Sequence, residues 1–178
     1  MPIEISVTIN QDPVTASVLD HQLLCDFLRD ERGLLGTRVG CNEGVCGSCT
    51  ILVDGQQIRS CLMLAAQADG REVLTVEGLA TGPGGRDLHP LQRAFIEYGA
   101  IQCGFCTAGL LMASKALLDA NPQPTEAEIL EGLAGNLCRC TGYVKVAQAV
   151  AAAGQMLAAG DGTHGTRDVL AMTQENVG

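Results

Sequence analysis

The sequence predicts an α+β protein in which a strand-rich first half is followed by a helical second half. Apolar residues alternate along the first half as in half-buried strands, whereas the second half has the three-to-four-residue spacing of helices. Between them lies GLATGPGGRD, a stretch rich in Gly and Pro as flexible linkers are. We therefore predict one domain at residues 1–78, a linker at 79–87, a second domain at 88–160 and a tail at 161–178.

The first half contains the predicted strands and one short helix. In IEISVTI, apolar side chains occupy alternate positions, which indicates a half-buried strand. Asp54 and Gly55 form a DG pair between two apolar runs, and this pair predicts a tight hairpin turn. The predicted elements follow the order strand 3–9, strand 14–18, helix 21–31, hairpin 50–59 and strand 71–79.

The second half contains four predicted helices. Pro90 stands near the first helix start, where its missing N–H costs little. Thr125 and Glu128 form the S/T-x-x-E capping box that opens a helix. Four helices with short connections predict a small bundle. Their ranges are 88–100, 106–122, 125–135 and 143–160.

Composition excludes several classes of protein. The 178 residues carry a formal net charge of −9, which argues against nucleic acid or anionic membrane as the partner. The sequence contains no run of about 18 apolar residues, the length that a helix needs to span a bilayer. The first ten residues lack the basic and apolar regions of a signal peptide, so we expect a cytoplasmic protein. In that compartment the nine cysteines are expected to be metal ligands rather than disulfide partners.

A first group of four cysteines has the spacing C-x4-C-x2-C-x11-C. This is the spacing of plant-type [2Fe–2S] ferredoxins, whose thiolates come from a chain that wraps the cluster closely. The four candidate ligands, called here the first quartet, are Cys41, Cys46, Cys49 and Cys61.

Glycines surround the first quartet. Gly40, Gly44 and Gly47 let the backbone curl and point N–H groups at the cluster sulfurs without Cβ clashes. Four thiolates also hold zinc, which is the alternative interpretation. Zinc sites usually use paired C-x2-4-C knuckles, so the long glycine-rich loop favours an iron–sulfur cluster.

A second group of four cysteines lies in the helical half. One pair stands at the predicted start of the second helix and the other pair stands before the fourth. Helix N-termini carry partial positive charge, which favours thiolates and an anionic cluster. The alternative is two pairs of buried cysteines that pack as small hydrophobic residues. The candidate ligands, called here the second quartet, are Cys103, Cys106, Cys138 and Cys140.

Together these motifs resemble a known family. The segments GCNEGVCGSCT…SCL, HPLQRAF, QCGFCTAG and NLCRCTGY are similar to the iron–sulfur subunit or domain of the molybdenum hydroxylases, the xanthine oxidase and carbon monoxide dehydrogenase family. The resemblance covers about residues 3–155, and no motif ligand is missing. It implies a plant-type ferredoxin (β-grasp) domain followed by a four-helix-bundle domain, each with one [2Fe–2S] cluster.

The resemblance also implies a function and partners. A large subunit with a molybdopterin-type molybdenum cofactor would oxidise the substrate, and this chain would supply no catalytic residue. Electrons would pass to the helical-domain cluster, then to the ferredoxin-domain cluster, and leave through an FAD subunit or a cytochrome. The assembly would be a heterotrimer or a dimer of heterotrimers. In the family the residues that match Gln102 and Cys140 approach the pterin.

Two other classes of protein remain as alternatives. A free-standing ferredoxin would carry electrons alone, although it needs no helical domain. A zinc-binding interaction module would use the same thiols without redox chemistry. Cys25 lies outside both quartets and is interpreted as an inert packing residue. The three histidines have no ligand spacing, and they are His21, His89 and His164.

Overall fold

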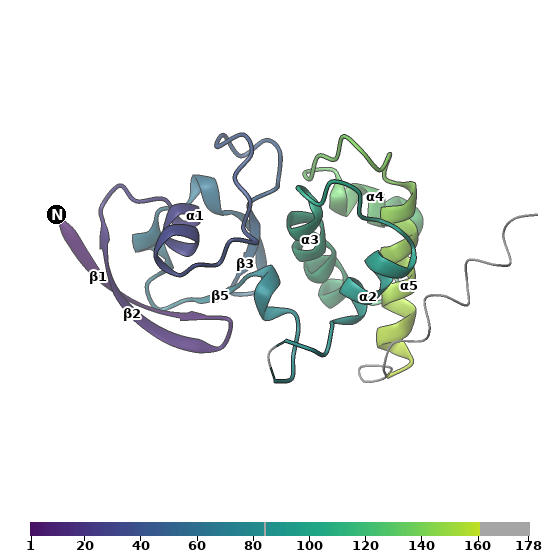
Figure 1. Ribbon diagram of the computed structural model, residues 1–178, viewed down its shortest axis with the longest axis horizontal. Helices are drawn as coiled ribbons and strands as arrows, with labels where there is room; N and C mark the ends of the chain where they lie inside the picture. Colours follow the sequence, from purple (N-terminus) through teal and green to yellow (C-terminus); the bar gives the residue numbers. More distant parts are fainter. Residues whose placement is uncertain (84, 161–178) are drawn as a thin grey trace, which may run out of the picture.

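The computed structural model describes residues 1–83 and 85–160, and the predicted tail lies outside them. A sheet with short helices occupies one side of the molecule and four longer helices occupy the other (Figure 1). The sheet has the strand order β2-β1-β5-β3-β4, with β1 and β5 parallel and the other pairs antiparallel. Its strands are β1 Pro2–Ile9, β2 Asp12–Leu19, β3 Thr50–Val53, β4 Gln56–Arg59 and β5 Glu72–Leu74.

The strands follow the predicted pattern with one difference. Asp54 and Gly55 both have positive φ values, 50° and 78°, as the predicted hairpin turn requires. The strand predicted at 71–79 ends at Leu74, because the Thr75 N–H donates to the Asn10 side chain at 2.8 Å instead of a neighbouring strand. A 3-10 turn, Val76–Gly78, follows.

One short helical segment packs with the sheet. It consists of α1, Leu24–Asp26, and a π-helical turn, Phe27–Glu31. Leu24, Phe27 and Leu28 are fully buried, which explains the helical spacing seen in the sequence. This segment leads directly into the loop that carries the first three cysteines of the first quartet.

The four predicted helices are present. They are α2 Pro90–Glu97, α3 Thr107–Ala120, α4 Glu126–Leu133 and α5 Val144–Ala158. The predicted capping box begins α4, since Thr125 and Glu128 exchange side-chain-to-backbone hydrogen bonds. His89 caps α2 by accepting the Leu91 N–H at 3.2 Å, so it serves as a helix-start residue. Within the described ranges, no helix is long and apolar enough to cross a membrane.

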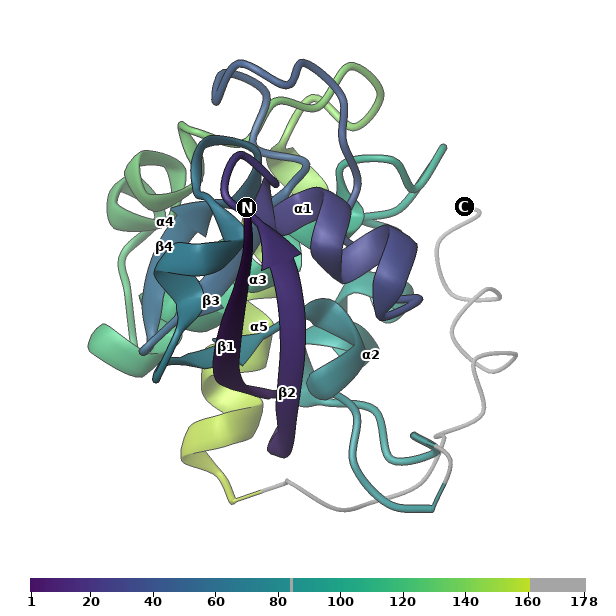
Figure 2. The same ribbon diagram turned by 90° about the vertical axis from the view of Figure 1, so that its left-hand side faces the viewer.

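Strand β3 joins the two sides because it is buried on both faces. Ile51 and Val53 pack with β1 and α1, whereas Leu52 points the other way and packs with the helices. Helix α3 lies against β3 (Figure 1). Figure 2 shows β1 and β2 in front, with the helices behind the sheet. The sheet and the helices therefore share a close contact, although each has its own apolar core.

The predicted linker is held in place at its start and its end. Leu79 is buried in the helical core at 4% exposure. Thr81 and Asp87 exchange backbone hydrogen bonds of 2.9 and 3.0 Å. Burial of Leu79 and the pairing of Thr81 with Asp87 thus fix both ends of the linker.

Candidate iron–sulfur centres

The first quartet divides into an outer and an inner pair. Cys41 and Cys46 belong to the loop after the π-helical turn and are partly exposed. The Cys41 sulfur accepts N–H groups from Cys46 at 3.3 Å and from Glu43 at 3.4 Å. These two backbone donors hold the pKa of the Cys41 thiol at about 6, well below its usual value. The loop therefore favours a thiolate at this position.

The inner pair, Cys49 and Cys61, lies at the two ends of the β3–β4 hairpin. Both residues are buried, with 2% and 3% exposure. Ser60 fixes their approach, because its N–H and its hydroxyl both donate to the Cys49 carbonyl oxygen, at 3.3 and 2.8 Å. Burial and the neighbouring Cys49 raise the pKa of the Cys61 thiol to about 11, while the Gly44 N–H works in the opposite direction.

The predicted loop glycines differ in what they provide. Gly44 and Gly47 have φ values of 75° and 74°, a left-handed conformation that other residues rarely adopt. Gly40 has a negative φ, and a Cβ atom there would make tight contacts, 3.1 Å from the Cys46 sulfur and 3.2 Å from the Phe105 ring. The N–H groups directed at Cys41 come from Glu43, Val45 and Cys46, whereas among the loop glycines Gly44 supplies a donor toward Cys61.

The second quartet also divides into two pairs. The sulfur atoms of Cys103 and Cys140 lie 3.5 Å apart, and both residues are exposed. Cys106 is the N-cap residue of α3 and is buried, with 9% exposure. Its thiol lies beside that of Cys138. The loop that leads into α5 therefore brings Cys138 and Cys140 to the start of α3.

The pKa values of the two thiols in the Cys106–Cys138 pair are shifted in opposite directions. Burial raises the pKa of Cys106 to about 12, and the adjacent Cys138 adds to the effect. Burial also acts to raise the pKa of Cys138, but Thr141 overrides it. The Thr141 hydroxyl and N–H both donate to the Cys138 sulfur, at 3.1 and 3.4 Å, and leave its pKa lowered.

Paired thiols suit a binuclear cluster better than a single ion. In a [2Fe–2S] cluster each iron takes two protein ligands, so two pairs of thiols separated by the cluster width are required. A zinc site needs four ligands around one point. Among the residues that the structure describes, no group of three or more His, Cys, Asp or Glu side chains is placed to hold one metal ion. The thiols of both quartets lie in pairs, as the ligands of a [2Fe–2S] cluster do.

Cys25 lies closer to the first quartet than its sequence position indicates. It is fully buried and packs against Cys49 and Cys61. Burial, together with the Asp26 carboxylate, raises the pKa of its thiol to about 12. Like the other eight cysteines it forms no disulfide. A neutral, enclosed thiol agrees with the packing role predicted from the sequence.

The two loops that carry the quartets meet at one end of the molecule. They lie side by side at the top of both ribbon views (Figures 1 and 2). The Leu137 N–H donates to the Cys46 carbonyl oxygen at 2.9 Å, and the buried Asn136 side chain donates to the Gly47 carbonyl oxygen at 2.9 Å. Sequence reasoning missed Asn136, because nothing in GNLCRC marks its partners 89 residues earlier.

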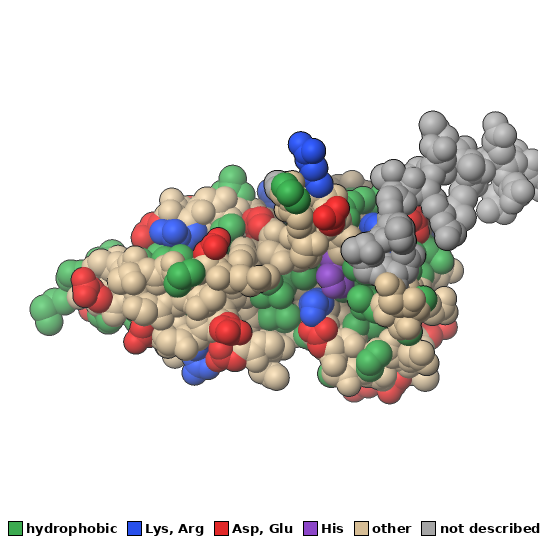
Figure 3. Space-filling view, turned by 90° about the horizontal axis from the view of Figure 1, so that it is seen from below, with side chains coloured by type: hydrophobic (Ala, Val, Ile, Leu, Met, Phe, Trp, Pro, Cys, Tyr) green, Lys and Arg blue, Asp and Glu red, His purple; other side chains and the backbone are tan. Residues whose placement is uncertain are grey.

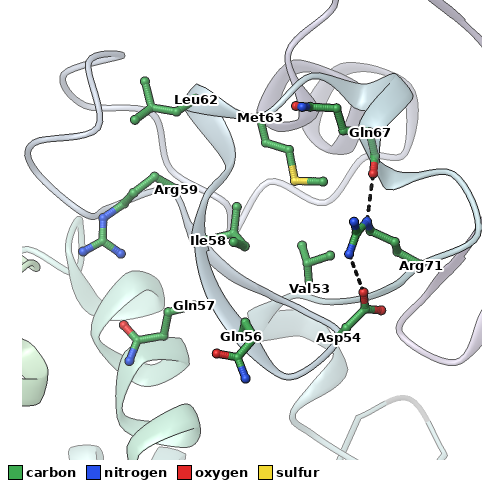
Figure 4. A pocket seen from close by; sticks show the side chains of 10 residues that line it. All are labelled: Val53, Asp54, Gln56, Gln57, Ile58, Arg59, Leu62, Met63, Gln67 and Arg71. Atoms are coloured by element: carbon green, nitrogen blue, oxygen red, sulfur yellow. Dashed lines mark hydrogen bonds and ion pairs between the residues drawn. The ribbon is translucent and has the colours of Figure 1, made fainter.

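A surface pocket of about 540 Å³ lies beside the edge strand β4 (Figure 4). On one wall Arg71 donates to the Asp54 carboxylate at 2.8 Å and to the Gln67 carbonyl oxygen at 3.0 Å. Arg59 and Gln57 stand on the side that faces the helices. None of the cysteines lines this pocket, so it is distinct from the two candidate centres.

Comparison with known proteins identifies both parts of the chain. A domain family described as "2Fe-2S iron-sulfur cluster binding domain" matches residues 7–97. A second family, described as "[2Fe-2S] binding domain", matches residues 75–151. The first match contains the first quartet and the second match contains the second quartet.

Individual relatives cover most of the chain. The nicotine 6-hydroxylase small subunit of Paenarthrobacter nicotinovorans is 53% identical over 83% of this chain and 87% of its own length. The xanthine dehydrogenase iron-sulfur-binding subunit of Escherichia coli O157:H7 is 50% identical over 83% of this chain and 92% of its own. A chain of quinoline 2-oxidoreductase from Pseudomonas putida 86 has a TM-score of 0.84 and 46% identity, covering 89% of this chain and 98% of that one.

The fold, the paired thiols and these matches define an iron–sulfur electron-transfer protein. More specifically, the chain belongs to the family of small iron–sulfur subunits of xanthine dehydrogenase-type molybdenum hydroxylases. It is an electron-transfer subunit of an oxidoreductase, as the sequence resemblance implied. This assignment replaces the two alternatives, a free-standing ferredoxin and a zinc-binding interaction module.

Proposed function

We propose that each quartet holds one [2Fe–2S] cluster, which would accept and release one electron. The observation that carries this proposal is the arrangement of all eight thiols as two pairs per site, with N–H and hydroxyl donors directed at Cys41 and Cys138. Such donors stabilise thiolate ligands and tune the reduction potential. The two sites correspond to a ferredoxin-like domain at 1–78 and a helical-bundle domain at 88–160, joined by the linker 79–87.

We also propose that the partner chains are a large molybdopterin subunit and a medium FAD subunit, in a cytoplasmic heterotrimer or dimer of heterotrimers. Electrons would enter at the helical domain and leave from the ferredoxin-like domain toward the flavin or a cytochrome. Exposed apolar side chains around the second quartet support a partner surface there. They are Ile101, Phe105, Leu137 and Val144, with exposures of 39–65%.

Charged side chains do not single out a partner surface on the face shown in Figure 3. The chain carries a formal charge of −9. On the face seen from below, acidic side chains are spread over both halves instead of gathering in one place (Figure 3). We therefore place the main partner contact at the apolar end around the clusters.

Gln102 is proposed as a pterin contact, together with Cys140. Gln102 is exposed and adjoins Cys103, and its amide can both donate and accept hydrogen bonds. Gln102→Ala is expected to leave iron content and cluster spectra unchanged, while reduction by substrate slows or assembly with the large subunit weakens. Stopped-flow reduction and co-purification measure these effects. Gln123→Ala, at an exposed site between α3 and α4, serves as the control.

Wild-type assembly and reduction rate in the Gln102 variant would remove this residue from the proposed route. If Gln102→Ala and its control Gln123→Ala behave alike, the Gln102 amide has no specific role in partner contact.

The ninth cysteine provides a test of the ligand assignment. Cys25→Ala is expected to retain the full iron content, because Cys25 belongs to neither quartet and packs as a buried side chain against Cys49 and Cys61. It should cost about 1–2 kcal/mol of stability through a small cavity. Cys61→Ala, at a similarly buried position, should instead lose the first cluster. Iron analysis compares the two variants, and equal iron loss in both would contradict the assignment.

The proposed partners are tested by purifying the protein from its native host. Mass spectrometry of the co-purifying chains should find a large molybdenum-containing chain and an FAD chain. Nicotine, xanthine and quinoline appear in the names of the relatives, so a substrate screen should begin with nitrogen heterocycles. Elution of this chain alone as a stable, cluster-loaded monomer would count against an obligate assembly.

A further inference from the structure

Three consecutive residues connect the two quartets. Asn136 is buried at 1% exposure, and its side-chain N–H groups donate to the Gly47 carbonyl oxygen at 2.9 Å and to the Thr50 hydroxyl at 3.1 Å. The next N–H, of Leu137, donates to the Cys46 carbonyl oxygen at 2.9 Å. Cys138 follows directly. One hydrogen bond therefore separates the backbone of a first-quartet residue from the neighbour of a second-quartet residue.

Arg59 supports this contact from the edge strand β4. Its guanidinium donates to the Thr50 hydroxyl and to the Gly135 carbonyl oxygen, both at 2.7 Å. The Thr50 hydroxyl in turn donates to the Gly47 carbonyl oxygen at 2.6 Å. Asn136, Arg59 and Thr50 thus form one connected polar group, called here the latch. Its hydrogen bonds join the first-quartet loop to the second-quartet loop.

Tyr143 holds the same segment from the other side. Its hydroxyl accepts the Cys138 N–H at 2.7 Å and donates to the Asn136 carbonyl oxygen at 3.3 Å. The residue has a φ of 69°, a left-handed conformation that is strained for a bulky side chain. The two hydrogen bonds of the Tyr143 hydroxyl, to Cys138 and Asn136, offset the energetic cost of that conformation. Residues 136–138 are therefore fixed on both sides.

The backbones approach too closely for a larger residue between them. A Cβ atom on Gly47 would lie 2.3 Å from the Gly135 carbonyl oxygen, and one on Gly109 would lie 2.3 Å from the Gly47 carbonyl oxygen. The close approach lets the Leu137–Cys46 hydrogen bond form directly. Electron tunnelling weakens faster across an open gap than through covalent and hydrogen bonds, so this geometry bears on transfer between the clusters.

We propose that Asn136 is a positioning residue for electron transfer between the two clusters. Through the latch it holds the Leu137 N–H on the Cys46 carbonyl oxygen and keeps the inter-cluster contact short. The step moves one electron and neither makes nor breaks a covalent bond. This inference rests on the proposed function, because it requires one cluster in each quartet.

The test uses the assembled holoenzyme with three variants at two positions of the latch. Asn136→Leu removes both side-chain donors at similar volume. Thr50→Val removes the hydroxyl that accepts from Asn136 and Arg59, and Thr50→Ser restores it. Each protein is characterised by iron content, by the paramagnetic resonance signals of the two clusters, by the magnetic coupling between them, and by electron equilibration after pulse radiolysis.

Wild-type protein and Thr50→Ser are expected to behave alike. Asn136→Leu and Thr50→Val should keep both cluster signals while inter-cluster transfer slows several-fold and the magnetic coupling weakens. A merely structural role would lower thermal stability without slowing transfer between intact clusters, and that result would overturn the inference. So would a failure of Thr50→Ser to restore the rate. If wild-type protein shows only one cluster signal, the proposed function itself fails, whatever the variants do.

Discussion

Gly47→Ala is expected to be the most destabilising single substitution in the first-quartet loop. The new Cβ would lie 2.3 Å from the Gly135 carbonyl oxygen and 2.8 Å from the Asn136 side-chain nitrogen. Relief of this clash requires the two loops to separate, which leaves the buried Asn136 amide without its partner. Strain at φ 74° and the unsatisfied amide together should cost about 2–5 kcal/mol. Thermal unfolding followed by visible absorption measures the loss.

Gly55→Ala is the matched control for this prediction. Gly55 lies in the hairpin turn and has nearly the same φ, 78°, but a Cβ atom added there would meet nothing within 4 Å. This variant therefore carries the left-handed strain alone, about 1–2 kcal/mol. Equal destabilisation of the two variants would show that the contact between the loops contributes nothing to stability.

Cys106→Ala is expected to remove half of the iron and leave the helices folded. Loss of one ligand should empty the second quartet, so that about two irons per chain and one resonance signal remain. The helical core survives because its largest members are apolar side chains with no dependence on the cluster. Leu91, Phe95, Leu110, Met112 and Val150 all have 0–1% exposure.

Three measurements check the Cys106 prediction. Iron analysis and paramagnetic resonance report the cluster content, and far-ultraviolet circular dichroism reports the helices. Cys61→Ala should give the complementary result, with the other signal lost. The assignment of two independent quartets is wrong if either substitution removes both signals or leaves the iron content unchanged.

Local spacing made the chemistry of this chain predictable. The C-x4-C-x2-C-x11-C and C-x2-C…C-x-C patterns need no tertiary information, and neither does the capping box at Thr125. The pairing of Cys103 with Cys140 was not predictable, because it depends on how the loop before α5 returns to the start of α3. Which thiols lie together as pairs is thus a property of the fold.

The contacts of residues 136–138 could not be predicted from the sequence, for a related physical reason. Asn136 acts through Gly47 and Thr50, which lie 89 and 86 residues away, and such contacts leave no periodic pattern. Tyr143, with its positive φ and its hydroxyl contacts to Cys138 and Asn136, also carries no sequence signal of this role. In the strand predicted at 71–79, one side-chain contact from Asn10 decided where the strand stopped.

The central claim, that this chain carries two [2Fe–2S] clusters, is tested most directly by metal analysis and paramagnetic resonance on one intact preparation. We expect about four irons per chain, no stoichiometric zinc and, after reduction, two distinguishable signals, because the two sites differ in fold and hydrogen bonding. Two irons with a single signal, or a colourless protein with bound zinc, would contradict the account.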